Sequence, residues 1–322
     1  NPANGNVIVT LSMRRAKKSI GESGEFESIS TSAESASFFE ALKVISTWND
    51  KGIIFGHLEF VLVGEQAARE GILPLLDHYV RSYETRLTSN MLIVKDGMAK
   101  DVITTTSAQG NFLSDRLLNH LEDSKEQNYS GGIKVYELMN LIEDKLSSAY
   151  VPYIITDKFM DPPPDDGGGG GSGGGEGRGG EKGNGTSGLG SKDIRLTGFG
   201  VFKGDKLITF LDERDSRVLK LLKDSINGSV ITLIDEKVGI VSIEIVENNV
   251  KIKPKIENQK LYCDIDISLS GNIGEIRGSQ SVFDKKIINR LNSLFRNSIQ
   301  AEVEHLLDVD KENKIDFIGI RN

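Results

Sequence analysis

The apolar positions of the first 160 residues follow two different spacings. Short apolar runs bounded by turn residues predict strands, and they cover residues 7–13, 58–63 and 91–94. Apolar residues at steps of three and four predict helices, and they cover residues 38–45, 65–80, 114–127 and 134–146. Pro74 should kink or break the second of these helices. The alternation of strands and helices favours a mixed sheet covered by helices.

The last 130 residues are richer in strand patterns. β-branched or alternating segments predict strands over residues 196–202, 206–210, 230–234, 238–246, 250–256 and 261–269. A long amphipathic helix is predicted over residues 284–307. The expected fold class is therefore α+β, with several subdomains, mixed sheets with packed helices, and a C-terminal multi-stranded sheet crossed by one long helix.

A change of composition separates these two parts. Three prolines and a glycine/serine tract with almost no apolar side chain occupy residues 161–192. Such a segment cannot bury enough surface to offset its ordering entropy, so it is predicted to be a flexible linker or loop. We therefore expect an N-terminal α/β-type mixed domain over 1–160 and a C-terminal α+β domain over 193–322.

Charge and cysteine content exclude several function classes. The net charge of −8 disfavours a nucleic-acid binder, which needs a basic face. The single cysteine, Cys263, excludes a disulfide framework and a cysteine-based metal cluster. The sequence begins without methionine, and the Asn4-Gly5 turn has no strand before it, which predicts a chain trimmed at its N-terminus.

Few residues suggest chemistry. The four histidines do not have metal-ligand spacing, and no nucleophile with a paired base can be nominated. His57 is interpreted as a hydrogen-bonded structural residue or, alternatively, as a binding residue. The acidic cluster from Asp212 to Asp215 is interpreted as stabilising a helix N-terminus, with acid–base chemistry as the alternative. We therefore predict no catalytic, cofactor or metal site.

Alternating lysines mark one predicted strand. Lys251, Lys253 and Lys255 share one face of the segment 250–256. Such a face could meet anionic headgroups, but it is more typical of a solvated face that discourages edge pairing.

Several further motifs occur along most of the chain. Those in the first half are SFFEAL (37–42), IFGH (54–57), LVGE (62–65), AAREGI (67–72), LLD (75–77), RL (86–87) and AKD (99–101). Those in the second half are TGFGVFKGDKL (197–207), LDERDSR (211–217) and IDFIGI (315–320). In this order, the motifs resemble those of the Ger(x)C family of lipoproteins, the C subunits of spore germinant receptors.

The resemblance implies a function as well as a fold. It implies a non-enzymatic lipoprotein, tethered through an N-terminal lipidated cysteine to the outer face of the spore's inner membrane. It also implies two membrane-spanning partners, the A and B subunits, and a role in nutrient-triggered germination. The sequence departs from the family in lacking that cysteine and the family's usual C-terminal segment, so we expect a soluble part that is trimmed at both ends.

Two other functions remain open from the sequence. One is a spore envelope hydrolase, which would require His57 to lie close to Asp212 and Glu213. The other is direct binding of the nutrient, which would require a pocket with apolar walls and a few polar groups. For an interaction surface, the candidate residues are Gly56, His57, Asp212, Glu213 and Arg217.

Overall fold

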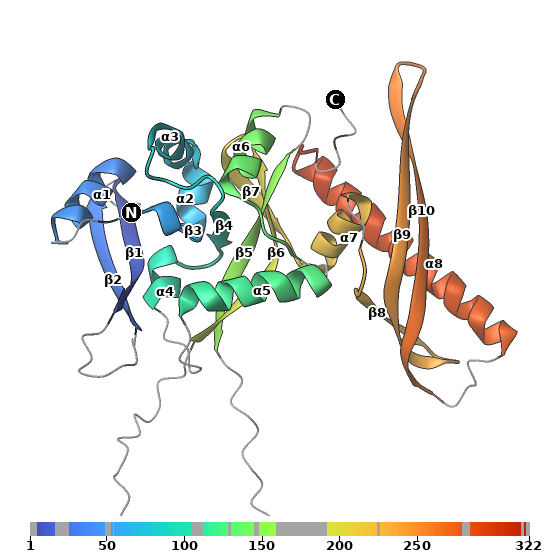
Figure 1. The fold of residues 1–322 in the computed structure, drawn as a ribbon. Coiled ribbons are helices and arrows are strands. Elements are labelled where there is room, and N and C mark those ends of the chain that lie inside the picture. Colours follow the sequence, from blue (N-terminus) through green and yellow to red (C-terminus); the bar gives the residue numbers. More distant parts are fainter. Residues whose placement is uncertain are drawn as a thin grey trace, which may run out of the picture.

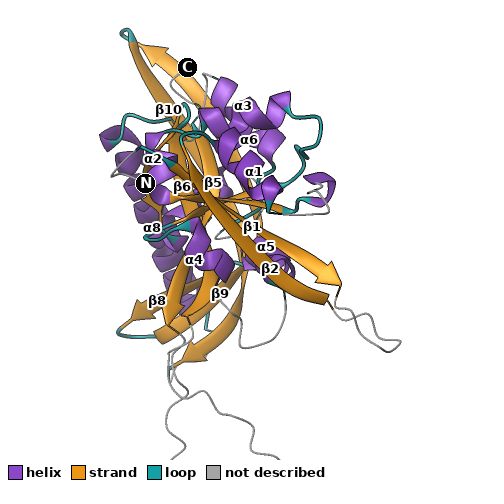
Figure 2. Ribbon diagram, turned by 90° about the vertical axis from the view of Figure 1, so that its left-hand side faces the viewer, coloured by secondary structure: helices purple, strands orange, loops and turns teal. Residues whose placement is uncertain are grey.

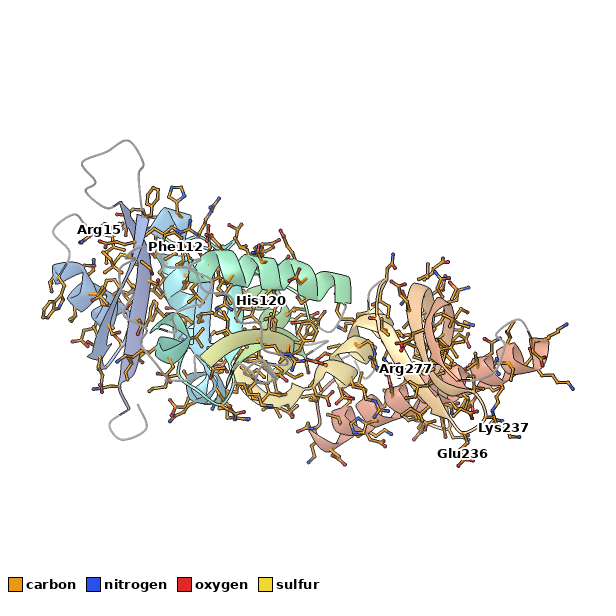
Figure 3. All side chains as sticks on the ribbon, turned by 90° about the horizontal axis from the view of Figure 1, so that it is seen from below. Arg15, Phe112, His120, Glu236, Lys237 and Arg277 are labelled. Atoms are coloured by element: carbon orange, nitrogen blue, oxygen red, sulfur yellow. The ribbon has the colours of Figure 1, made fainter. Side chains whose placement is uncertain are left out.

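A computed structural model describes most of the chain as an elongated molecule (Figures 1 and 3). The described residues are 5–16, 26–48, 53, 55–104, 112–127, 130–144, 148–158, 192–223, 226–278, 284–316 and 319. Of the predicted linker or loop 161–192, all residues except Lys192 lie outside the described part. Within the described residues, no helix combines the length and the apolar character that crossing a bilayer would need.

A small subdomain forms the N-terminal end. Strands β1 (Val7–Ala16) and β2 (Phe26–Ser35) pair antiparallel, and helix α1 (Phe38–Thr47) packs on them. Ser37 caps α1 by accepting the Glu40 N–H at 3.2 Å. The shared core is small and consists of Val9, Ala33, Ala41, Leu42 and Ile45.

A five-stranded mixed sheet forms the centre. Its spatial order is β3 (Phe60–Gly64), β4 (Asn90–Val94), β5 (Ala149–Lys158), β6 (Lys192–Lys203) and β7 (Lys206–Leu211). The first three strands are parallel, and β6 and β7 continue antiparallel. The mixed sheet expected from the alternating pattern is therefore confirmed. Because β5 and β6 pair, strands from both predicted domains share this sheet, and the division at 160 and 193 stays a prediction.

Helices cover both faces of this sheet (Figures 1 and 2). One face packs against α2 (Glu65–Glu70), α3 (Leu73–Arg81) and α6 (Val135–Glu143), and the other against α4 (Ala99–Thr104) and α5 (Leu113–Gln127). A 3-10 turn, η1 (Phe55–His57), precedes β3.

The predicted continuous helix over residues 65–80 is two helices. The chain breaks at Gly71, whose φ of 128° is not helical. Pro74 lies in the first turn of α3, where its missing N–H costs no hydrogen bond. The predicted break therefore exists, and it lies before the proline.

The C-terminal part packs a three-stranded antiparallel sheet against two helices. Strands β8 (Val230–Asp235), β9 (Gly239–Glu257) and β10 (Lys260–Arg277) lie in the order β10-β9-β8. Helices α7 (Glu213–Lys223) and α8 (Lys285–Glu312) contribute to the same core, and α8 crosses the sheet as expected (Figure 1). The predicted strands 238–246 and 250–256 are one strand, β9.

The far end of the β9–β10 hairpin extends beyond this core (Figure 1). We call residues 247–270 the hairpin arm. Its tip is a two-residue turn at Asn258 and Gln259, with φ values of 52° and 63° that suit the twist of the flanking strands. Strand β8 pairs only with residues 239–244 of β9, so the arm is a two-stranded ribbon.

Candidate functional site

The motif LDERDSR forms the start of α7 and connects the two sheets. The chain leaves β7 at Leu211, and the Asp212 carboxylate accepts the backbone N–H of Asp215 at 2.9 Å. This is the bond that an aspartate makes when it caps a helix N-terminus. Glu213 and Asp215 follow in the first turn, where negative charge is favourable. The interpretation of this cluster as a helix start is confirmed.

Glu213 fixes α7 to the central sheet. Its carboxylate accepts the Thr197 hydroxyl at 2.9 Å and pairs with the Arg195 guanidinium. Both partners belong to β6, the strand that enters the second half of the molecule. The contact therefore joins α7 to the five-stranded sheet.

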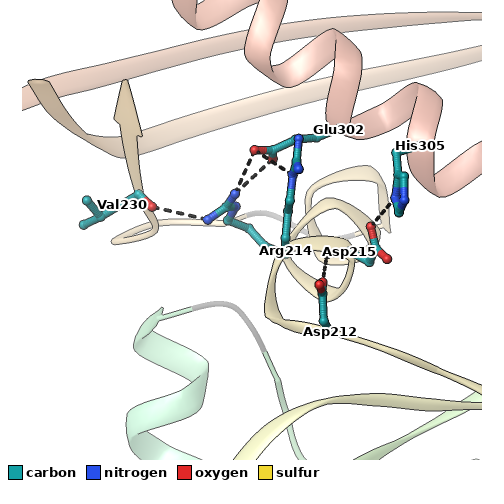
Figure 4. A network of polar contacts seen from close by, with 7 residues as sticks. Asp212, Arg214, Asp215, Val230, Glu302 and His305 are labelled. Carbon is teal, nitrogen blue, oxygen red and sulfur yellow. Dashed lines mark hydrogen bonds and ion pairs between the residues drawn. The ribbon is translucent and has the colours of Figure 1, made fainter. Parts of the chain in front are cut away.

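Arg217 fixes α7 to α8 and β8. Figure 4 shows the polar contacts around Glu302 and Asp215. Its Nη2 donates to both carboxylate oxygens of Glu302, at 3.1 and 2.9 Å, and its Nη1 donates to the Val230 carbonyl at 3.3 Å. Arg214 contacts the same Glu302 carboxylate at 3.3 Å. Because only 6% of the Glu302 side chain is exposed, its charge depends on these two guanidinium groups.

A second pair lies one turn further along α8. The His305 Nδ1 lies 3.0 Å from Asp215 Oδ1. Burial raises the pKa of Asp215 because it disfavours the charged carboxylate, and the hydrogen bond from His305 only partly opposes this effect. The contacts of Asp212, Glu213, Asp215, Arg217 and Glu302 thus form neighbouring groups around the start of α7, which together we call the α7 junction.

The structure separates His57 from this junction. His57 precedes β3, one outer strand of the central sheet, whereas Asp212 follows β7, the other outer strand. Since β3 and β7 run in the same direction, the two residues lie at opposite ends as well as opposite edges. Four strand spacings of about 4.8 Å separate the edges. The acid–base pair that the hydrolase hypothesis required is therefore not formed.

The five predicted interaction residues fall into two groups. Asp212, Glu213 and Arg217 make contacts within the fold, as described above. Gly56 and His57 are exposed on η1, and among the described residues the His57 side chain forms no hydrogen bond or ion pair. Their role as an interaction surface stays a prediction.

The junction's partners on α8 were missed by sequence reasoning. Glu302 lies three residues after Ile299 and four before Leu306, which places a charged residue within an apolar stripe. A charged residue on such a face is rarely buried unless it is paired. That position was the available signal for a buried partner of Arg217.

The described residues offer few other groups that could bind a metal ion or act as a nucleophile. No group of three or more histidine, cysteine, aspartate or glutamate side chains there is arranged to hold a metal ion. Burial raises the pKa of the Cys263 thiol, which disfavours a reactive thiolate. A hollow of about 390 Å³ lies between α6, the central sheet and α7, and none of the five candidates lines it. Its lining residues are Gly131, Gly132, Ile133, Glu137, Asn140, Leu141, Tyr150, Phe199 and Lys220.

Comparisons with known proteins cover most of the chain. Residues 2–156 match the family described as Spore germination protein N-terminal domain, and residues 197–322 match Spore germination B3/GerAC like, C-terminal. Spore germination protein KC of Bacillus subtilis (strain 168) is 23% identical over 89% of this chain and 68% of that protein. The putative spore germination protein YfkR of the same organism is 24% identical, over 85% and 65%.

A solved structure shares the fold. The crystal structure of the GerBC protein superimposes with a TM-score of 0.55 and 18% identity, covering 96% of this chain and 85% of that one. The α+β class with a C-terminal antiparallel sheet and a long helix is therefore confirmed. The chain spans about two thirds of the length of the two B. subtilis relatives.

Proposed function

Because the chain belongs to the GerAC-like family of spore germination proteins, we propose that it is a non-enzymatic C subunit of a nutrient germinant receptor. The observation that carries the proposal is the match of both halves, in order, to the two regions of that family. The α7 junction supports the non-enzymatic part, because its carboxylates and arginines are engaged in holding α7. The family implies a spore-associated location.

The partners and the anchor belong to the same proposal. The protein acts with membrane-spanning A and B subunits and is held by lipid at the outer face of the spore's inner membrane. Both statements rest on the family resemblance. Two acyl chains on one cysteine suffice for stable attachment of a folded domain to a bilayer.

The test is nutrient-triggered loss of optical density in spores that lack this gene. The natural full-length gene is restored with its lipidation site intact or with the acceptor cysteine replaced by alanine. We expect no response without the gene, rescue by the lipidated form, and little rescue by the alanine form at equal protein level. A normal response of the deletion strain to every nutrient would contradict the proposal.

The exposed residues of η1 test the interaction surface. His57→Ala should weaken the response without lowering protein abundance, because this side chain is exposed and forms no hydrogen bond or ion pair with the described residues. Lys285→Ala is the matched control, since it is an exposed residue at the start of α8, at the other end of the molecule. Equal responses of the two variants would remove Gly56 and His57 from the proposed surface.

A further inference from the structure

The two faces of the hairpin arm differ in chemistry. Directly opposite residues share a face, and one face pairs Val250 with Ile267, Ile252 with Ile265, and Pro254 with Cys263. Val250, Ile265 and Ile267 still pack against the C-terminal core, whereas towards the tip Ile256 is 79% exposed. The apolar row therefore continues beyond the part of the molecule that covers it.

The other face of the arm is charged. Lys253 pairs with Asp266 at 2.9 Å, and Lys255 pairs with Asp264. The lysines are exposed, as predicted for a solvated face. We call these two ion pairs the zipper. Its lysines lie on β9 and its aspartates lie on β10, so the two strands carry opposite charges on this face.

The turn determines which backbone N–H and C=O groups of the arm point outward. In a two-residue hairpin, the residues flanking the turn exchange both backbone hydrogen bonds, and every second pair along the ladder does the same. Glu257 and Lys260 flank the turn, so the pairs that lack mutual bonds include 254 with 263, 252 with 265 and 250 with 267. The N–H and C=O groups of Cys263, Ile265 and Ile267 therefore point to the outer edge of β10.

The two edges of the arm are not equally protected. On β9, Pro254 occupies a position whose N–H would point outward, and the strand bulges near Val246, where β10 shifts register at Ser270/Gly271. On β10, residues 260–270 contain no proline and no register shift. Among the described residues, β10 is the last strand of its sheet, and no backbone hydrogen bond reaches its outer edge.

We propose that this edge of β10 accepts an extended segment of a partner protein, in which apolar residues alternate with lysine or arginine. The added strand would bond to the outward groups of Cys263, Ile265 and Ile267. Its apolar residues would extend the exposed row of the arm, and its basic residues would lie beside Asp264 and Asp266. Opposite charges on neighbouring strands stabilise such pairing.

Charge disfavours a second copy of this chain as the occupant. Two β10 strands that paired around a two-fold axis at Ile265, the centre of the outward-facing groups, would place Asp264 opposite Asp266 of the other copy and Asp266 opposite its Asp264. Like charges directly opposite each other on paired strands are destabilising. The proposal does not depend on a role in germination, because it rests on the edge and the charges of the arm.

The first experiment measures binding of a labelled peptide that alternates valine with lysine, by fluorescence anisotropy. Two control peptides are used, one of the same composition with the valines and lysines in separate blocks, and one that alternates valine with glutamate. We expect binding of the alternating lysine peptide alone. Equal binding of the block peptide would overturn the proposal, because it would show unspecific attraction to an acidic protein.

A matched pair of variants locates the site. Ile265→Pro removes an N–H from the outer edge of β10, whereas Ile252→Pro removes one from the outer edge of β9, directly opposite on the same face. Ile265→Pro should weaken binding about tenfold or more, as expected for lost backbone hydrogen bonds, and Ile252→Pro should leave it unchanged. Equal effects of the two variants would overturn the proposal.

Hydrogen exchange keeps the test valid even where a variant fails to fold. In the unmodified protein, the amides of Cys263, Ile265 and Ile267 should exchange fast alone and slowly with the peptide, whereas those of Asp264 and Asp266 should be slow in both states. Uniform protection along β10 without peptide would overturn the proposal. Loss of peptide binding in a longer natural form of the chain would also overturn the proposal. The edge of β10 would then be occupied by a segment of the same protein instead of a partner.

Discussion

Strand β4 and the hairpin arm are both strands, but their surroundings are opposite. All five residues of β4 are buried, with Met91 and Ile93 packed in the cluster on one face of the central sheet and Leu92 and Val94 in the cluster on the other. The arm has partial cover on one face and solvent on the other. A strand covered by helices on both faces is a continuous apolar run, whereas the β9 strand of the arm alternates lysine with isoleucine or proline.

The difference shows where each strand obtains its stability. The neighbours of β4 belong to distant parts of the chain, including β5 and α5, so its burial depends on the whole fold. The arm depends mainly on its own hairpin, whose strands are adjacent in sequence. Substitutions in β4 should therefore affect global unfolding, while substitutions near the arm's tip should affect binding to its edge.

The largest expected effect comes from cutting back a side chain of β4. Leu92→Ala should lower the free energy of unfolding by about 2–5 kcal/mol, because it leaves a cavity where no atom of Leu92 is exposed. Ile256→Ala, at the arm's tip, should change it by less than about 0.5 kcal/mol. Urea unfolding of both variants makes the measurement. Similar losses would show that the arm is as much a part of the core as β4.

The α7 junction should give the next largest effect, because its central pair, Arg217 and Glu302, is largely buried. Arg217→Met leaves the buried Glu302 with Arg214 alone, so we expect a loss of about 2–3 kcal/mol in the free energy of unfolding. The double variant Arg217→Met/Glu302→Leu should recover most of this loss, because it removes both charges. A double variant as unstable as the single one would contradict the explanation by an unpaired charge.

The sequence predicted most helices and strands correctly, but it predicted less well where one strand continues into the next. Helices α1, α5, α6 and α8 were found because a packed face repeats every three or four residues. Strand β2 was missed, since its serines and glutamates give a weak alternating pattern. Strand β9 was split in two because its apolar positions change from odd to even numbers around Val246, where the pairing shifts register.

The candidate site depended on topology that no local pattern contains. The spacing of residues says nothing about strand order, so the separation of His57 from Asp212 could not be derived from it. The role of Asp212 as a helix cap could be predicted, because capping is local. The partners of Arg217 and Asp215 lie on α8, about 85–90 residues away, and only the position of Glu302 within an apolar stripe indicated them.

Two aspartates in different surroundings should take up their protons at different pH values. Asp215, in the junction, has a pKa raised by burial, whereas bonds from Arg290 lower the pKa of Asp235, at the β8–β9 turn, to about 2. As pH falls, Asp215 should therefore take up its proton first, and acidification should relieve its unfavourable burial. The stabilising contact of Asp235 should persist below its ordinary pKa and be lost only near pH 2. Carboxyl NMR titration measures both, and the reverse order would contradict these environments.

The smallest expected effect belongs to the charged face of the arm. Lys253 and Asp266 are close, at 2.9 Å, but both side chains are more than half exposed. Water and salt screen such a pair, and holding two mobile side chains offsets its attraction. Lys253→Ser should therefore leave the urea midpoint unchanged within error, at low and at high salt. A clear loss of stability at low salt would show that the ion pairs between lysines and aspartates hold the hairpin together. The aspartates of β10 would then be less available to a basic strand at its open edge.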